Sequence, residues 1–325
     1  MKHAAWILCG VLTGAVPAVE SPAVAQDSFP SAPIRLVVGF APGAIADSAS
    51  RLLGQKIAGQ MNAAVVVENR TGANGNIAAE YVAKSKPNGY TLLFNTMTIV
   101  LGPAAGQRTG YDILKDLVPV ARAVNAPNLI ALHPAVPANS LAEFLGFVRA
   151  SSGKVSYSSA GTGSPSHLGM VLLLQAYNLT AVHVPYKGAG PALLDVVGGH
   201  VQFTMAGLTG VLPLLRDKRV KVVAITSLQR SPLLPDVPAL AESMPGFEMV
   251  VWLGVMAPAD TPPAVVRKVN LEFVKALQDT EIQSRLAQQG AEPSPSSPED
   301  YGAYIRKELE RWTGVFKSTG IKLDD

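Results

Sequence analysis

The chain has 325 residues, of which 48% are hydrophobic and 16% charged, a composition typical of a folded globular protein and not of a disordered one. The formal net charge is only +3, and no run of lysine or arginine is interleaved with aromatic residues, which disfavours a nucleic-acid-binding role. The length accommodates two domains of about 150 residues, each with its own hydrophobic core.

The first 25 residues have the three parts of a secretory signal peptide. Lys2 gives a basic start, an apolar stretch covers residues 4–16, and Ala23-Val24-Ala25 has the small-x-small pattern of a signal-peptidase site. The apolar stretch is shorter than the roughly 20 residues that a transmembrane helix needs. We therefore predict a signal peptide over residues 1–25 that is cleaved after Ala25, export of the protein and a mature chain without a membrane span.

The only cysteine, Cys9, lies inside the predicted signal peptide, so the mature chain contains no disulfide and must be held by its cores. Cys9 follows Leu8 instead of a small residue, and a lipid-anchored form remains the less favoured alternative.

From residue 34 onward, apolar runs alternate with segments of helical spacing. Strands are expected at residues 34–40, 65–67 and 90–94, with helices at 45–57 and 77–84 between them, followed by an irregular stretch over 95–116. Strands that alternate with helices need crossover connections, which predicts a parallel sheet.

A second series of elements begins after two extended segments, residues 118–124 and 129–132. Strands are expected at 155–158, 182–184, 201–205 and 220–225, and helices at 141–150, 167–177 and 191–197. A proline-rich linker over 231–238, a strand over 249–256 and helices over 263–277, 281–289 and 298–316 complete the chain. Ser140, Ser164 and Ser297 are the expected N-caps of their helices.

This order predicts an α/β protein with two lobes, each a mainly parallel sheet flanked by helices. Lobe 1 is expected to comprise residues 26–123 and 229–325, and lobe 2 residues 124–228, inserted between them. Two chain crossovers at a hinge suit a clamshell that closes on a ligand in the cleft between the lobes.

Several sequence blocks resemble the substrate-binding family of tripartite tricarboxylate transporters, also called Bug-type receptors. They are residues 29–43 (FPSAPIRLVVGFAPG), 65–77 (VVVENRTGANGNI), 87–93 (PNGYTLL), 157–168 (YSSAGTGSPSHL) and 184–192 (VPYKGAGPA). The resemblance implies a receptor in the periplasm that hands carboxylates to a membrane transporter. It also implies the fold of a two-lobed, type II-like periplasmic binding protein that closes as a clamshell.

Two positions depart from the family pattern. Ala44 replaces the second glycine of an Ala-Pro-Gly-Gly loop, and its methyl group is expected to crowd the ligand or to remove a positive-φ conformation. Residues 204–207 read Thr-Met-Ala-Gly where the family often has an aspartate, which makes the pocket less acidic and more apolar.

In open parallel sheets, ligands bind beyond the carboxyl ends of the strands, at loops that lead into helices. The loop over residues 41–47 offers free backbone N–H groups at a helix start, a site for an anion, although an ordinary tight turn is the alternative. Asp47 is either a ligand contact or an organiser of this loop. His167 is either structural or a contact, and Lys187 is the one cation in these loops.

The candidate ligand-binding residues therefore occupy five segments. They are Ala41, Pro42, Gly43, Ala44, Ile45, Asp47; Asn95, Thr96, Met97, Thr98; Gly161, Thr162, Gly163, Ser164, Ser166, His167; Lys187, Gly188; and Thr204, Met205, Ala206.

Motifs of catalysis are missing from the sequence. It has no Gly-x-Ser-x-Gly elbow and no His-Glu-x-x-His, and its five histidines (His3, His133, His167, His183, His200) lack metal-ligand spacing. We therefore predict no enzyme activity, no catalytic residue, no metal and no cofactor. The expected function is capture of a small carboxylate, either a di- or tricarboxylate or an aromatic acid, by a monomer that delivers it to membrane transporter subunits. A ligand sensor that presents its bound form to a receptor kinase is the alternative.

Processing of the signal peptide gives the first testable prediction. When the full chain is expressed in a Gram-negative bacterium, N-terminal sequencing of the periplasmic fraction should begin near Gln26, after Ala25. Recovery of an uncleaved chain in the membrane fraction would contradict it.

Overall fold

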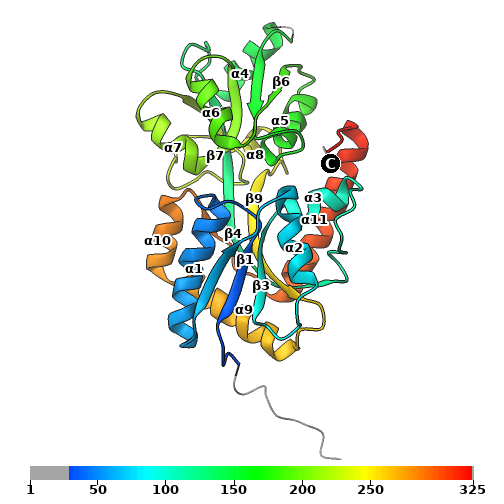
Figure 1. Ribbon diagram of the computed structural model, residues 1–325. Coiled ribbons are helices and arrows are strands. Elements are labelled where there is room, and N and C mark those ends of the chain that lie inside the picture. The colour runs from blue at the N-terminus through cyan, green and yellow to red at the C-terminus, as the bar shows by residue number, and fades with distance from the viewer. Residues whose placement is uncertain (1–28, 152, 324–325) are drawn as a thin grey trace, which may run out of the picture.

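The computed structural model describes residues 29–151 and 153–323 (Figure 1). The expected signal peptide, residues 1–25, lies outside the described residues. The described strands pair in the order β2-β1-β3-β9-β4-β7-β5-β6, and β8 and β10 also pair with β4. Their bounds are β1 (Ile34–Val38), β2 (Val65–Asn69), β3 (Thr91–Thr96), β4 (Leu117–Leu132), β5 (Ser156–Ser159), β6 (Val182–Pro185), β7 (Phe203–Gly207), β8 (Lys221–Ile225), β9 (Val250–Pro258) and β10 (Glu292–Pro293).

The helices begin where the sequence supplies N-caps. Ser140, Ser164 and Ser297 each accept a hydrogen bond from the backbone N–H three residues later, as predicted. The helices are α1 (Ile45–Met61), α2 (Asn76–Ala83), α3 (Thr98–Ala104), α4 (Leu141–Ala150), α5 (Pro165–Ala176), α6 (Ala189–Val197), α7 (Leu208–Arg216), α8 (Leu240–Ser243), α9 (Pro263–Gln278), α10 (Thr280–Gln288) and α11 (Pro298–Thr319), with a 3₁₀ turn, η1 (Ala73–Gly75). The stretch over residues 95–116, expected to be irregular, contains α3.

The sheet is mixed, which corrects the expectation of mainly parallel sheets. The βαβ units are parallel as expected, because β1 lies parallel to β2 and β3, and β5 lies parallel to β6 and β7. However, β9 runs antiparallel to β3 and β4, and β4 runs antiparallel to β7 and β8. The two long strands that join the two series of elements, β4 and β9, therefore run antiparallel to the strands beside them.

Strand β4 is a single 16-residue strand where the sequence predicts two short ones. Its first part pairs with β9 up to Pro127, and its last part pairs with β7 and β8 from Asn128 or Leu129 onward. Figure 1 shows two groups of elements along it. Group A is β1–β3, β9, β10 and the start of β4 with α1–α3 and α9–α11, and group B is the end of β4 and β5–β8 with α4–α8.

Three hydrophobic cores hold the two groups. One core lies wholly in group A, between the sheet and helices α1 and α9, and includes Leu53, Phe94 and Phe273. Another lies wholly in group B and includes Val196 and Val211. The largest core contains residues of both groups, from Leu93 on β3 to Met205 on β7. Both groups thus have cores of their own, and a further core lies where they meet.

Helix α11 is fixed to β9 by a buried carboxylate. Glu308 accepts hydrogen bonds from Nε1 of Trp252 at 3.0 Å and from Nε1 of Trp312 at 3.1 Å, and both indoles are fully buried. Arg311 adds an ion pair to the other carboxylate oxygen. A charge buried in this way is tolerated because its oxygens receive several donors.

Replacement of Glu308 tests this arrangement. Glu308→Ala should lower the free energy of unfolding by about 3 kcal/mol, because two buried indole N–H groups lose their acceptor. Urea denaturation followed by tryptophan fluorescence measures the change, and Glu310→Ala on the exposed face of α11 is the matched control. Equal stability of the two variants would contradict the assignment.

Candidate functional site

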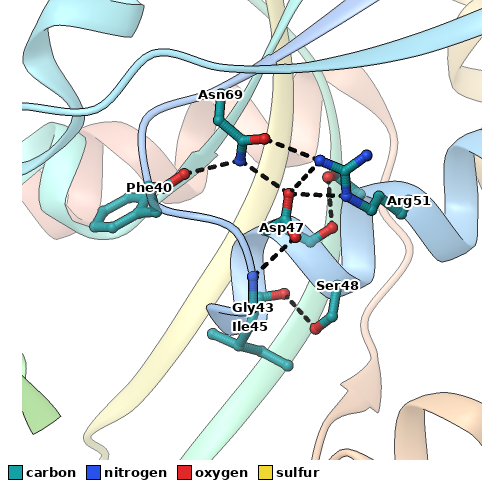
Figure 2. A network of polar contacts seen from close by, with 8 residues as sticks. Phe40, Gly43, Ile45, Asp47, Ser48, Arg51 and Asn69 are labelled. Atoms are coloured by element: carbon teal, nitrogen blue, oxygen red, sulfur yellow. Dashed lines mark hydrogen bonds and ion pairs between the residues drawn. The ribbon is translucent and has the colours of Figure 1, made fainter. Parts of the chain in front are cut away.

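The loop between β1 and α1 is organised by the carboxylate of Asp47 (Figure 2). One carboxylate oxygen accepts a hydrogen bond from the backbone N–H of Gly43 at 3.0 Å. The other accepts from the guanidinium of Arg51 and from the side-chain amide of Asn69, whose amide also donates to the carbonyl oxygen of Phe40. Asp47 is only 4% exposed, so it acts here as an organiser of the loop.

The protonation state of Asp47 follows from these contacts. Burial by itself would raise the pKa of Asp47, but hydrogen bonds from Arg51, Gly43 and Asn69 together hold it below the usual value of 3.8. The carboxylate is therefore charged at neutral pH and keeps the loop in place.

Not every backbone N–H group of residues 41–47 is available to a ligand. Gly43 has φ +87°, and its N–H is occupied by Asp47. Ala44, the N-cap, has φ −68°, an ordinary value for alanine, so its methyl group removes no required conformation. The N–H groups of Ile45 and Ala46 lie in the first turn of a 17-residue helix, where no intrahelical acceptor exists.

Two further segments of group A lie against this loop. A Cβ atom added to Gly39 would lie 2.5 Å from Cα of Gly75, so the two backbones are in direct contact. The hydroxyl of Thr98 lies 2.9 Å from that of Thr96 and donates to the carbonyl oxygen of Asn74. A cavity of about 10 Å³, about the space one water molecule needs, lies between the three segments.

Not every candidate on the β3–α3 segment is available. The amide of Asn95 exchanges hydrogen bonds with the hydroxyl of Tyr301, and both residues are buried. Met97 is 1% exposed and belongs to the core. Asn74, which the sequence analysis did not select, is exposed and has φ +53°. In the sequence, only the position of Asn74 after Gly72-Ala73 could have marked it as a candidate.

The larger surface cavity nearby, about 730 Å³, lies between η1, α2 and residues 106–110 and also includes Asn74. Its wall carries Glu80 and Arg108, which have opposite charges. The wall therefore carries charges of both signs.

In group B, the loop before α5 is stabilised by its own side chains. Ser164 caps the helix by accepting from the N–H of His167 at 3.3 Å, and its hydroxyl lies 3.0 Å from that of Ser166. Ser166 also accepts from the N–H of Ala160. The N–H of Gly163 donates to Nδ1 of His167 at 3.0 Å, which places the ring proton of the neutral histidine on Nε2.

His167 is stacked on a second histidine that the sequence analysis did not select. The rings of His167 and His183 have centroids 3.9 Å apart and an interplanar angle of 9°, and Tyr157 stacks on His183 at 5.0 Å. The hydroxyl of Ser159 lies 2.7 Å from Nε2 of His183. Burial, with a smaller effect of the charge of His183, lowers the pKa of His167 to about 4, so His167 is neutral at pH 7.

The remaining candidates differ in exposure. Lys187 is exposed and forms no ion pair with a described carboxylate, and Gly188 has φ +117°. The hydroxyl of Thr204 donates to the carbonyl oxygen of Ser158 inside the sheet. Met205 and Ala206 are buried in cores, so these two candidates have little side-chain surface that a ligand could contact.

Some classes of site are not found in the described part of the chain. Residues 29–151 and 153–323 contain no group of three or more His, Cys, Asp or Glu side chains arranged to hold a metal ion. Within the same residues, no helix has the length and apolar character needed to cross a bilayer.

Comparison with known proteins identifies the class. Residues 49–321 match the family model described as "Tripartite tricarboxylate transporter family receptor", and the chain belongs to this family. The family consists of solute-binding receptors of the periplasm and not of enzymes, as the sequence predicts.

Individual relatives agree with this assignment. The chain is 34% identical to the protein BugT of Bordetella pertussis over 92% of this chain and 93% of that one. Among solved structures, an R. palustris protein with adipate has a TM-score of 0.81 at 32% identity, covering 90% of this chain and 99% of that one. MatC of Rhodopseudomonas palustris, with bound malate, has a TM-score of 0.76 at 31% identity, covering 88% and 99%.

The buried histidine gives a pH-dependent prediction. Unfolded His167 binds a proton below about pH 6.5, whereas folded His167 binds one only near pH 4, so stability should fall as the pH falls from 6.5 to 4. One such group contributes at most about 1.4 kcal/mol for each pH unit. His167→Gln keeps an acceptor for the N–H of Gly163 but does not titrate, and its stability should depend less on pH.

Denaturant unfolding at half-unit pH steps measures this difference, with His200→Gln as a control at an exposed histidine. A His167→Gln curve that runs parallel to that of the unchanged protein would show that burial does not govern the proton affinity of His167.

Proposed function

We propose that this protein is an extracytoplasmic receptor that captures a small carboxylate, a di- or tricarboxylate or an aromatic acid, in the periplasm and delivers it to the membrane subunits of a tripartite tricarboxylate-type transporter. The observation that carries the proposal is the pair of helix-start loops, before α1 and before α5, that end parallel strands in the two groups.

The directions of the strands support a ligand site between the groups. Strands β1, β3 and β4 share one direction, because β3 and β4 are both antiparallel to β9. Strands β5 and β7 run the opposite way, since β7 is antiparallel to β4. As β4 passes from group A into group B, the carboxyl ends of β1 and β3 point toward group B, and those of β5 and β7 point toward group A.

The two groups are accordingly proposed to be the two lobes of a clamshell, with residues 26–123 and 229–325 in lobe 1 and 124–228 in lobe 2. The group memberships support this two-part division but with later crossovers, since β4 changes partners between Pro127 and Leu129, and α8 of group B (Leu240–Ser243) precedes the return of the chain along β9. The ligand cleft then lies between the facing loops.

Neutral donors suffice to hold an anion in such a cleft. The N–H groups of Ile45 and Ala46 at the start of α1, and that of Ser166 at the start of α5, lie in first turns, where the helix dipole favours negative charge. Thr162, two residues before the N-cap Ser164, can add a hydroxyl donor, whereas the hydroxyl of Thr98 already donates to the carbonyl oxygen of Asn74. Lys187, being exposed, contributes weakly.

The electrostatics of these loops favour an anion that is recognised by hydrogen bonds. Asp47, the one charged group buried in the first loop, is already satisfied by Arg51, Asn69 and Gly43, and His167 is neutral at pH 7. No uncompensated negative charge therefore opposes a carboxylate. That two relatives are described with adipate and with malate supports the choice of carboxylates as the ligand class.

A substitution at the first position of α1 tests the proposed donor directly. Ile45→Pro removes one N–H that has no intrahelical acceptor, and proline is well tolerated at this position of a helix. The preceding residue, Ala44, already has the extended conformation (φ −68°, ψ 157°) that proline requires of its neighbour. Affinity should fall about tenfold, equivalent to about 1.4 kcal/mol for a charge-assisted hydrogen bond.

The matched control is Ile45→Ala, which shortens the same side chain but keeps the N–H. Titration calorimetry and thermal unfolding with adipate, malate, citrate and benzoate measure binding, and a true ligand at 100 times its Kd should stabilise the protein by about 2.7 kcal/mol. Adipamide, without the carboxylate charges, serves as the ligand control. If none of the four acids stabilises the protein, the carboxylate assignment fails, and equal affinities of the two variants would exclude the Ile45 donor.

A further inference from the structure

Besides β4, β9 and the core that the groups share, the part of the chain that follows β9 makes two contacts with group B. The first involves the residues after α11. Gly320 ends this helix with φ +67°, and the chain then turns so that Ile321 and Leu323 pack against the core shared by the two groups.

Leu323 lies directly on a candidate ligand loop. A Cβ atom added to Gly163 would lie 1.8 Å from Cδ2 of Leu323, so the leucine side chain occupies the space over this glycine. The N–H of the same glycine donates to Nδ1 of His167. A residue connected to group A thereby covers the loop that precedes α5 in group B.

The second contact involves the turn after α10. The hydroxyl of Thr209, in the first turn of α7, donates to the carbonyl oxygen of Gln289. A Cβ atom added to Gly290 would lie 2.8 Å from Cγ of Leu208, so the turn and the start of α7 are in direct contact. The side-chain oxygen of Gln289 accepts a hydrogen bond from the hydroxyl of Ser48 at 3.0 Å.

Both contacts join a helix start in one group to a segment of the other. Ser48 follows Asp47 in the first turn of α1, so the Gln289 turn connects the organised loop of group A to the helix that follows β7 in group B. Each contact has one side in each group, so a rotation of the groups that separates Leu323 from Gly163, or Thr209 from Gln289, breaks it. Contacts of this kind add their free energy only to the arrangement in which they form.

We propose that Leu323 and the Gln289–Gly290 turn are two latches that stabilise the closed arrangement of the lobes. The proposal rests on the clamshell part of the proposed function and not on the identity of the ligand. In a two-state hinge, loss of a latch raises the population of the open form and reduces the apparent affinity for any ligand that binds the closed form.

The test compares conservative latch variants with matched controls. Thr209→Val removes the donor hydroxyl, and Thr313→Val makes the same change on the exposed face of α11. Leu323→Ala removes the cover over Gly163, and Leu271→Ala makes the same change at a residue of α9 that is 55% exposed. Circular dichroism and thermal unfolding confirm that each variant is folded.

Interlobe distances are measured by double electron–electron resonance in the absence of any ligand. Spin labels are attached to cysteines introduced at Arg216 in α7 and Glu281 in α10, which are exposed, and no cysteine is present between residues 26 and 325 to interfere. Each latch variant should increase the ratio of open to closed molecules about fivefold over its control, and the double variant should increase it further.

The outcomes separate the two proposals. If the latch variants and their controls give the same distance distributions, the latches are refuted, whatever the protein binds. If the distances shift but no acid of the panel binds, the latches stand and the carboxylate function fails.

Discussion

The backbone ladder along β4 is the constraint on which the rest of the structure depends. This one strand pairs with β9 in group A and with β7 and β8 in group B, and it therefore fixes the direction of every neighbouring strand. Its burial makes the ladder obligatory, because an unpaired backbone group away from water would cost about as much as a lost hydrogen bond. The opposed directions of β3 and β7 follow, and with them the positions of the loops that begin α1 and α5.

Within this frame, each candidate loop is organised by a polar side chain that is itself satisfied. Asp47 fixes the first loop through Gly43, and His167 fixes the second through Gly163. Both glycines have positive φ, which a side chain would strain. The side chains occupy some backbone donors so that the remaining ones, on the first turns of the helices, keep a defined direction. At the proposed ligand site, such preorganisation would lower the entropic cost of binding.

The C-terminal part of the chain completes the core of group A and also contacts group B. Glu308 on α11 receives both buried indole groups, which positions this helix along β9, and the residues beyond it reach group B. Helix α10 similarly ends at a turn that contacts the start of α7. The elements that complete the core of group A are therefore also the ones whose ends contact group B.

Much of the fold was readable from local signals. Ser140, Ser164 and Ser297 marked helix starts because side-chain capping is a local interaction, and the βαβ units followed from alternating apolar periodicity. The family resemblance was readable from ordered sequence blocks. In contrast, the sequence does not predict that β4 is one strand of 16 residues, because Pro119 and Pro127 suggest breaks in it. In the structure, bulges and pairing with β9 accommodate both prolines.

By itself, the sequence determined the family, the α/β class and the loops that precede helices, since each depends on residues close together in the chain. Only the tertiary structure decided which of those residues remain available to a ligand. Asn95 is engaged by Tyr301, 206 positions away, and His167 on helix α5 stacks on His183 of strand β6. The physical reason is that a donor or acceptor is free or occupied according to its neighbours in space, and the folded β4 ladder decides which residues become neighbours.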